Sequence, residues 1–305
     1  MFTRLNSSLI LIQGIGAESF EPGEREKSLR CRLKKVVEVV GLGRLRAGSA
    51  RVVITPPVGT PLSGYASRVE GSMGVHDDLY AKCLILDDGA SRVAVIACDV
   101  AGFPKRFVAD VRKRVEELTG IPGDNVMVAA THTHTGPNNT AGGQDWITVL
   151  ARMLAGSAYA AWNNMRDARI GAGRGSCYVG VNRRNPASPR RPYWLYPWPD
   201  GPMDPEVQVL RLEDTDGNIT TLLVNYAAHP TSLKPPQKML WLSRDYPGHA
   251  VGVLERVKGG DVVAMYLNGT CGNVAPRDIW FKPDSPPPLP RPSFPEDLRL
   301  AFKET

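Results

Sequence analysis

The chain of 305 residues lacks any apolar run near the roughly 18 residues that a membrane-spanning helix needs. It also has only five cysteines, and none of them has the CxxC spacing of a zinc or redox motif. Scattered cysteines in odd number indicate neither a disulfide framework nor a cysteine zinc site, so we expect a reducing, cytoplasmic location. The five are Cys31, Cys83, Cys98, Cys177 and Cys271.

Most of the chain carries little net charge. Residues 1–47 contain nine Lys/Arg and five Glu, which accounts for four of the six net positive charges. The nearly neutral remainder gives no reason to expect nucleic acid as a partner. We interpret 1–47 as a basic arm, either disordered or a non-native start, and 48–305 as the folded part. A brief apolar patch within the first nineteen residues leaves a signal peptide, and hence secretion, as the alternative location.

Apolar periodicity in the folded part changes between strand-like and helix-like runs. We expect strands near 51–54, 80–86, 92–98, 126–130, 169–173, 177–181, 207–212, 220–226 and 262–267, and helices near 103–118, 146–165 and 246–257. This order predicts an α/β fold in which mixed β-sheets flanked by helices form a layered sandwich, with the site at strand ends. The loop at 182–202 is longer than an ordinary connection and is rich in Pro, Arg and aromatics, which favours a functional loop or lid.

The stretch NVMVAATHTHTGPN at 125–138 is the most informative in the chain. It begins as a buried strand and places His132 and His134 just beyond the strand end. Residues i and i+2 of an extended chain point to the same side, so the two imidazoles converge. That arrangement suits a metal ion, or a ligand together with a proton relay. The alternative is a pair of surface histidines in a polar loop.

Three predicted strands end in loops that are rich in His, Gly and Asn. These strands end near Ala130, Ala228 and Leu267, and His229 follows the second of them directly. Loops that converge at one edge of a sheet are a common way to build a site. We therefore expect His132, His134 and His229 to form one cluster at a common edge of the sheet.

Eight sequence blocks occur together and in order. They are ITPPVG (54–59), GYASR (64–68), GVHD with LYAK (74–77 and 79–82), THTHTGP (131–137), VNRR (181–184), HPTS (229–232), DYPG (245–248) and NGTCGNVAP (268–276). Over about residues 48–280 this set resembles the N-terminal catalytic domain of the neutral/alkaline non-lysosomal ceramidases. The resemblance implies hydrolysis of the amide bond of N-acylsphingosines at a single zinc ion.

The resemblance also assigns roles to individual residues. His132 and His229 match the zinc ligands of the family, and His134 matches a nearby non-ligand histidine suited to proton transfer. Arg183 matches an arginine of the active-site cleft, with catalytic and substrate-binding roles. A zinc ion lowers the pKa of its bound water to about 7 and polarises a carbonyl, so the implied scheme uses metal-activated water and no activated serine.

Two departures from the family pattern bear on activity. Ceramidases have Asp-Val-Ser-Pro where this chain has NVAP at 273–276, so the expected substrate-binding residues Asn273 and Ala275 include no serine hydroxyl. The family takes its other two zinc ligands, a glutamate and a tyrosine, from a segment well downstream. We therefore expect 48–305 to be a catalytic domain that is incomplete at its C-terminus, with weak zinc binding and poor turnover of ceramide.

Three functions stay open on this evidence. The first is a zinc-dependent amidohydrolase that acts on N-acylsphingosine or a related N-acyl amine. The second is an impaired relative that serves as a binding or vestigial module. The third is a generic metal-dependent hydrolase of a non-lipid substrate, in which Asp99 or Asp245 joins the three histidines. We interpret both carboxylates as loop caps.

Overall fold

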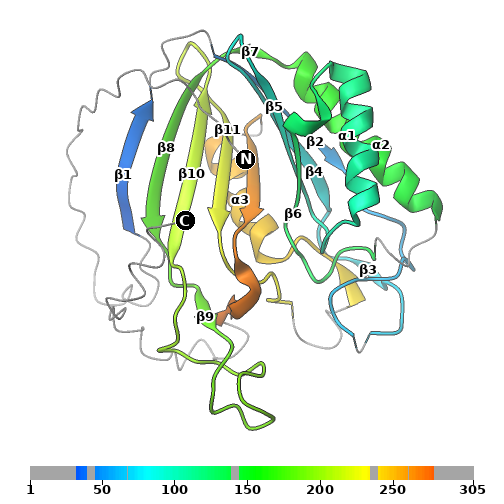
Figure 1. Cartoon of the computed structure of the whole chain (residues 1–305), viewed down its shortest axis with the longest axis vertical. Coiled ribbons are helices and arrows are strands. Elements are labelled where there is room, and N and C mark those ends of the chain that lie inside the picture. Colours follow the sequence, from blue (N-terminus) through cyan, green and yellow to red (C-terminus); the bar gives the residue numbers. More distant parts are fainter. Residues whose placement is uncertain are drawn as a thin grey trace.

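Two five-stranded sheets form the centre of the fold (Figure 1). The computed structural model describes residues 32–39 and 45–277, apart from 67, 139–143, 234–239 and 260. The first sheet has the order β6-β5-β4-β2-β7 and the second has the order β1-β8-β10-β11-β13. Each sheet is antiparallel except for one parallel pair, β5–β6 in the first and β11–β13 in the second. The fold is mixed α/β, as predicted.

The bounds of the strands agree closely with the apolar runs. The first sheet contains β2 (Arg46–Val53), β4 (Tyr80–Asp87), β5 (Arg92–Cys98), β6 (Val126–Ala130) and β7 (Arg166–Asp167). The second contains β1 (Arg32–Val39), β8 (Arg169–Ser176), β10 (Glu206–Glu213), β11 (Ile219–Tyr226) and β13 (Val263–Asn268).

Helices α1 (Lys105–Thr119) and α2 (Gln144–Asn163) cover the outer face of the first sheet (Figure 1). Strand alternation explains this layer, because Cys83 and Ile85 of β4 pack toward the helices while Leu84 packs toward the second sheet. Helix α1 buries Phe107 and Val111, one turn apart, in the same core. The sandwich therefore has one core between the first sheet and its helices and a separate core between the two sheets.

The core between the sheets is small and apolar. Its fully buried members are Ala47, Leu84 and Ala97 from the first sheet and Leu212, Val263 and Met265 from the second. Strand β13 alternates in the same way as β4, so Ala264 and Tyr266 point to the other face of the second sheet. There they pack with Val251 of α3 (Asp245–Lys258). Both faces of β13 are thus buried, in keeping with its continuous apolar run.

Short elements complete the end of the sandwich where β6, β11 and β13 terminate. Strand β3 (Gly74–Val75) pairs with β12 (Trp241–Leu242), and β9 (Gly180–Asn182) pairs with β14 (Val274–Pro276). A 3-10 turn, η4 (Cys271–Asn273), follows β13 at this end, whereas another, η2 (Gly123–Asn125), precedes β6 at its opposite end. The strand predicted at 177–181 is thus shorter than expected, and it pairs outside the two large sheets.

The predicted basic arm at 1–47 is only partly described. Its residues 32–39 form β1, an edge strand that pairs antiparallel with β8, and residue 46 begins β2. These two segments are therefore strands and not parts of a disordered arm. Residues 1–31, with the apolar patch, and 40–44 lie outside the described residues, so the predicted domain boundary stays a prediction. Among the helices that the structure describes, none is both long enough and apolar enough to cross a membrane.

A buried ion pair joins the first sheet to α3 and β13. Lys82 Nζ of β4 donates to Glu255 Oε1 at 2.7 Å and to the carbonyl of Ala264 at 2.7 Å. Glu255 also pairs with Arg51 at 3.3 Å and accepts the N–H of Ala264 at 3.0 Å. Burial lowers the pKa of Lys82 despite this carboxylate, so desolvation outweighs attraction at the ammonium group.

Removing the two partners of this pair should have unequal effects. Glu255→Ala leaves the Lys82 ammonium buried without its carboxylate and should lower the free energy of unfolding by about 3 kcal/mol. Lys82→Met fills a similar volume and leaves Glu255 with Arg51, so it should cost about 1 kcal/mol or less. Urea denaturation measures both, with the exposed pair Lys113–Glu117 as control, where Glu117→Ala should change little. A larger loss of stability for Lys82→Met than for Glu255→Ala would contradict this account.

Candidate metal centre

Three loops meet at the end of the sandwich where β6, β11 and β13 terminate. His134 N–H donates to the carbonyl of Pro230 at 3.3 Å, and Asn268 Nδ2 donates to the carbonyl of Thr131 at 3.1 Å. His132 Nε2 lies 3.1 Å from His229 Nε2 and 3.4 Å from His134 Nε2. The predicted cluster of three histidines is therefore present.

The predicted position at one common sheet edge is wrong. His132 and His134 follow β6 of the first sheet, whereas His229 follows β11 of the second. Strand periodicity in the sequence reports which residues share a strand face, but it does not report that two sheets stack with these ends together. The site therefore lies across the two layers of the sandwich.

His132 is held in place by its own backbone. Its φ of 70° lies in the left-handed region, which costs a non-glycine residue roughly 1–2 kcal/mol. Its backbone N–H donates to the carbonyl of Val100 at 3.0 Å, and its ring Nδ1 donates to the carbonyl of Ala101 at 2.6 Å. The second bond requires the proton on Nδ1, so Nε2 carries a free lone pair in the neutral ring.

His229 has the same ring arrangement. Its Nδ1 donates to the carbonyl of Cys271 at 2.8 Å, and its backbone N–H donates to the carbonyl of Val274 at 3.0 Å. The proton on Nδ1 again leaves Nε2 as an acceptor. A ring N–H bonded to a backbone carbonyl is the usual way in which metal-binding histidines are oriented.

The donor atoms fit a metal ion. With both protons on Nδ1, neither Nε2 of His132 nor that of His229 can donate to the other across their 3.1 Å separation. Two such lone pairs repel one another unless a cation lies between them. Two nitrogens that each lie ~2.0–2.1 Å from a tetrahedral zinc are ~3.3–3.4 Å apart, close to this separation.

Arg183 supplies a positive charge at the same point. Its Nη2 lies 3.0 Å from His229 Nε2 and donates to that lone pair. Its Nε and Nη2 also donate to the carbonyl of Gly272 at 3.1 Å and 3.0 Å. Burial, and then the neighbouring Arg184, lowers the pKa of Arg183 to about 10, so the group stays cationic at neutral pH. The His229 Nε2 lone pair thus already accepts a hydrogen bond from a cationic donor, which a metal ion bound there would replace.

His134 is packed more tightly than the other two rings. Its ring lies edge-on to Tyr65 with centroids 5.2 Å apart, and Arg68 Nη2 donates to its carbonyl at 2.6 Å. A Cβ on Gly64, whose φ is 105°, would lie 2.5 Å from His134 Cγ, so only glycine fits there. Burial, followed by the charges of His132 and His229, lowers the pKa of His134 to about 3.

Cys271 is the residue that the sequence interpretation missed. The thiol and one ring nitrogen each of His132 and His229 all lie within 4.8 Å of one another. The spacing of the five cysteines in the sequence indicates no shared site, and Cys83 and Cys98 are indeed buried in the core. The available signal was position: Cys271 lies in the glycine-rich block directly after β13.

The remaining predicted site residues lie around this cluster. Asn273 is exposed, and its carbonyl accepts the N–H of Arg183 at 2.8 Å. Ala275 is fully buried in β14 opposite Val181. The roles predicted for both in substrate binding stay predictions.

The two carboxylates of the third hypothesis act as caps, as interpreted. Asp99 accepts the N–H of Tyr80 at 2.9 Å, and Asp245 accepts the N–H groups of Ser232 and Leu233, each at 3.1 Å. Neither belongs to the donor group found within the described residues, which is formed by His132, His229 and Cys271.

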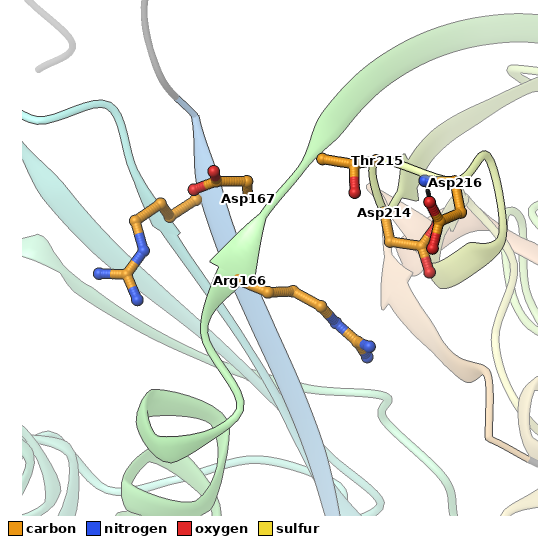
Figure 2. A pocket seen from close by; sticks show the side chains of 6 residues that line it. Arg166, Asp167, Asp214, Thr215 and Asp216 are labelled. Atoms are coloured by element: carbon orange, nitrogen blue, oxygen red, sulfur yellow. Dashed lines mark hydrogen bonds between the residues drawn. The ribbon is translucent and has the colours of Figure 1, made fainter.

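A cavity of about 470 Å³ lies at the opposite end of the sandwich. Figure 2 shows Arg166 and Asp167 of β7 on one side and the β10–β11 turn, with Asp214, Thr215 and Asp216, on the other. Arg46 completes the lining. These side chains include no imidazole or thiol, and their charges are mixed. The cavity is therefore separate from the histidine cluster.

Comparison with known families decides the relationship. The family described as "Neutral/alkaline non-lysosomal ceramidase, N-terminal" matches residues 46–279. The chain belongs to this family. The match starts at β2 and includes all three histidines, Arg183 and Cys271.

Individual relatives agree with this assignment. The chain is 26% identical to the neutral ceramidase of Drosophila melanogaster over 281 residues, which cover 82% of this chain and 37% of the relative. It is 24% identical to the neutral ceramidase of Pseudomonas aeruginosa over 243 residues, which cover 74% and 36%. The chain thus spans a little over a third of the length of these curated relatives.

Solved ceramidase structures share the fold. The crystal structure of the Pseudomonas aeruginosa neutral ceramidase superimposes with a TM-score of 0.66 at 22% identity, covering 76% of this chain and 39% of that one. A second structure, described as "Ceramidase complexed with C2", gives a TM-score of 0.68 at 22% identity, covering 81% and 41%.

The ring states of this ceramidase-family site can be measured in metal-free protein. Burial, more than the neighbouring charges, lowers the pKa of His229 to about 4 and that of His134 to about 3. Imidazole ¹⁵N NMR should show both rings neutral at pH 5, with the proton of His229 on Nδ1. In urea the same rings should protonate near ~6.5. The unfolded chain thus binds more protons, so the part of the stability due to the neutral rings is lost as pH falls from about 6.5 through 4. Protonation of the folded rings near 6.5 would contradict this burial.

Proposed function

We propose that the chain hydrolyses the amide bond of an N-acylsphingosine or a related N-acyl amine, with a zinc ion held by His132 and His229. One observation carries the proposal: two Nε2 lone pairs face each other at 3.1 Å, each set by an Nδ1 proton bonded to a backbone carbonyl. Family membership supports amide hydrolysis as the reaction.

The bound zinc would supply Lewis acidity and a water that is deprotonated near neutral pH. The chain's own residues supply the rest. His132 and His229 are oriented before any ion binds, because backbone carbonyls hold their rings. The carbonyl of Ala101 lies in the loop after β5, and that of Cys271 lies in the loop after β13. Little reorganisation is therefore needed when the substrate arrives.

His134 is suited to move a proton. Its ring is neutral at pH 7, and its Nε2 lies 3.4 Å from His132 Nε2. A group bound at His132 Nε2 would therefore lie close to the His134 ring. The low pKa makes its protonated form short-lived. A proton accepted there would pass on to the nitrogen of the departing amine, which needs one to leave.

Arg183 is suited to stabilise negative charge. Its guanidinium is half-buried, lies beside His229 Nε2 and is held by the carbonyl of Gly272. Cleavage of an amide develops an oxyanion on the carbonyl oxygen, and a fixed cation close to that oxygen lowers the barrier. Binding of an ion at His229 Nε2 would free Nη2 of Arg183 for this second role.

The loop between β9 and β10 supports an N-acyl substrate with an apolar chain. It begins at Arg183 and projects from the sandwich at the end that holds the site (Figure 1). Tyr193, Leu195 and Tyr196 of this loop are 60%, 40% and 43% exposed. Tyr196 N–H donates to the carbonyl of Arg183 at 3.1 Å, which brings this apolar surface close to the reactive groups.

A non-lipid amide is the second candidate substrate. The observation that favours it is Ala275, which is buried and provides no hydroxyl where the resemblance implies the serine of ceramidases. A panel of N-acyl amines with and without long chains distinguishes the two. Faster hydrolysis of long-chain substrates supports the lipid, and a preference for short acyl groups supports the alternative.

Substitution of one ligand tests the proposed zinc site. His132→Ala should lower zinc affinity and amide hydrolysis each by at least about 100-fold, because one of the two imidazole donors is lost. The control is His249→Ala, since this histidine is exposed on α3 and lies outside the cluster. Metal content by mass spectrometry and rates on the amide panel are the measurements. Unchanged zinc content and rate in His132→Ala would overturn the proposal.

A further inference from the structure

We propose that the Cys271 thiolate is a protein ligand of the metal ion beside the imidazoles of His132 and His229. The inference rests on the proposed zinc site and adds a donor to it. It concerns a residue for which the sequence blocks suggest no role.

The geometry brings the sulfur within reach. The Cys271 sulfur and one ring nitrogen each of His132 and His229 lie within 4.8 Å of one another. Zinc binds sulfur at ~2.3 Å and nitrogen at ~2.0–2.1 Å, so a tetrahedral site needs nitrogen–sulfur separations of ~3.5 Å. The upper limit of 4.8 Å exceeds this separation by about 1.3 Å, a distance that a change of side-chain rotamer can span.

The backbone around Cys271 is fixed to the same imidazole. The carbonyl of Cys271 accepts the Nδ1 proton of His229 at 2.8 Å, and the next carbonyl, that of Gly272, accepts two bonds from Arg183. The N–H of Cys271 donates to the carbonyl of Gly269 at 2.8 Å. One residue thus orients the His229 ring through its carbonyl and carries a thiol close to the same imidazole.

The other described cysteines have different surroundings. Cys83 and Cys98 are fully buried in the core between the first sheet and its helices, and Cys177 lies in the core beside α3. Cys271 is only partly buried, and within the described part of the chain it alone joins a possible metal-binding group. Its position in a loop beside two imidazoles is typical of a ligand and not of a core residue.

The chemistry of a donor set with two imidazoles and one thiolate is favourable. Three protein donors with one open position is the usual composition of a catalytic zinc site. Binding replaces the S–H proton by the metal ion, and the proton leaves to solvent. One thiolate reduces the net charge of the ion and its ligands from +2 to +1, and a soft sulfur donor selects zinc or cobalt over magnesium or calcium.

Cobalt spectroscopy tests the sulfur directly. Co²⁺ added to the metal-free chain should produce the near-ultraviolet charge-transfer absorption of a cobalt–thiolate bond. Cys271→Ser should abolish this band and lower zinc affinity by about 10- to 100-fold. Cys177→Ala is the matched control, and it should leave both the band and the affinity unchanged.

Alkylation of the unmodified chain gives a second readout that does not depend on any variant. Zinc should protect Cys271 from iodoacetamide, with the modified residue identified by mass spectrometry. Alkylation at an equal rate with and without zinc would overturn the proposal, as would an unchanged cobalt spectrum in Cys271→Ser.

These outcomes are distinguishable from failure of the proposed function. If His132→Ala abolishes metal binding while Cys271→Ser leaves affinity and spectrum unchanged, the sulfur ligand is wrong and the histidine site stands. If neither variant changes metal binding, both proposals are wrong.

Discussion

Two backbone carbonyls, each accepting the Nδ1 proton of a histidine, set the chemistry of this protein. The carbonyl of Ala101 fixes His132 and that of Cys271 fixes His229, so both Nε2 lone pairs face the same point. Each carbonyl belongs to a loop at the end of a different sheet. The relative position of the two rings therefore depends on how the sheets stack. The small apolar core between the sheets and the buried Lys82–Glu255 pair both stabilise this stacking.

The surroundings of His134 and His229 keep both imidazoles neutral. Burial lowers the pKa of His134 and of His229, and the Arg183 guanidinium beside them favours their neutral forms further. Neutral rings keep their lone pairs available at neutral pH, which a metal site requires. The left-handed backbone of His132 and the absence of space for any side chain at Gly64 show that local backbone preferences yield to this arrangement.

Much of the fold was predictable because its elements have simple periodicity. Strands β4 and β5 alternate between two buried faces, and α1 repeats Phe107, Val111 and Val115 at helical spacing, so both patterns can be read locally. The histidine cluster was also predictable, because His132 and His229 lie two and three residues beyond the ends of β6 and β11, although β6 is a half-exposed edge strand and not the buried strand expected. The stacking of two sheets was not, since no local pattern reports which layer a strand joins.

The position of Cys271 in the site could not be predicted from local sequence patterns either. Its neighbours in sequence are glycines and polar residues, and its relation to His229 exists only through a loop that returns across the sheet end. The strand β1 was missed for a related reason: its pairing with β8 joins segments more than 130 residues apart, and charge dominates its sequence. Such contacts depend on the tertiary fold and not on local propensity.

The central claim is that one metal ion binds between the two sheet ends. Anomalous X-ray scattering from crystals of the full chain, measured on both sides of the zinc absorption edge after zinc is added, tests it most directly. The account predicts one strong peak ~2.0–2.1 Å from both His132 Nε2 and His229 Nε2. A peak confined to the cavity lined by Asp167, Asp214 and Asp216, with none between the imidazoles, would contradict it.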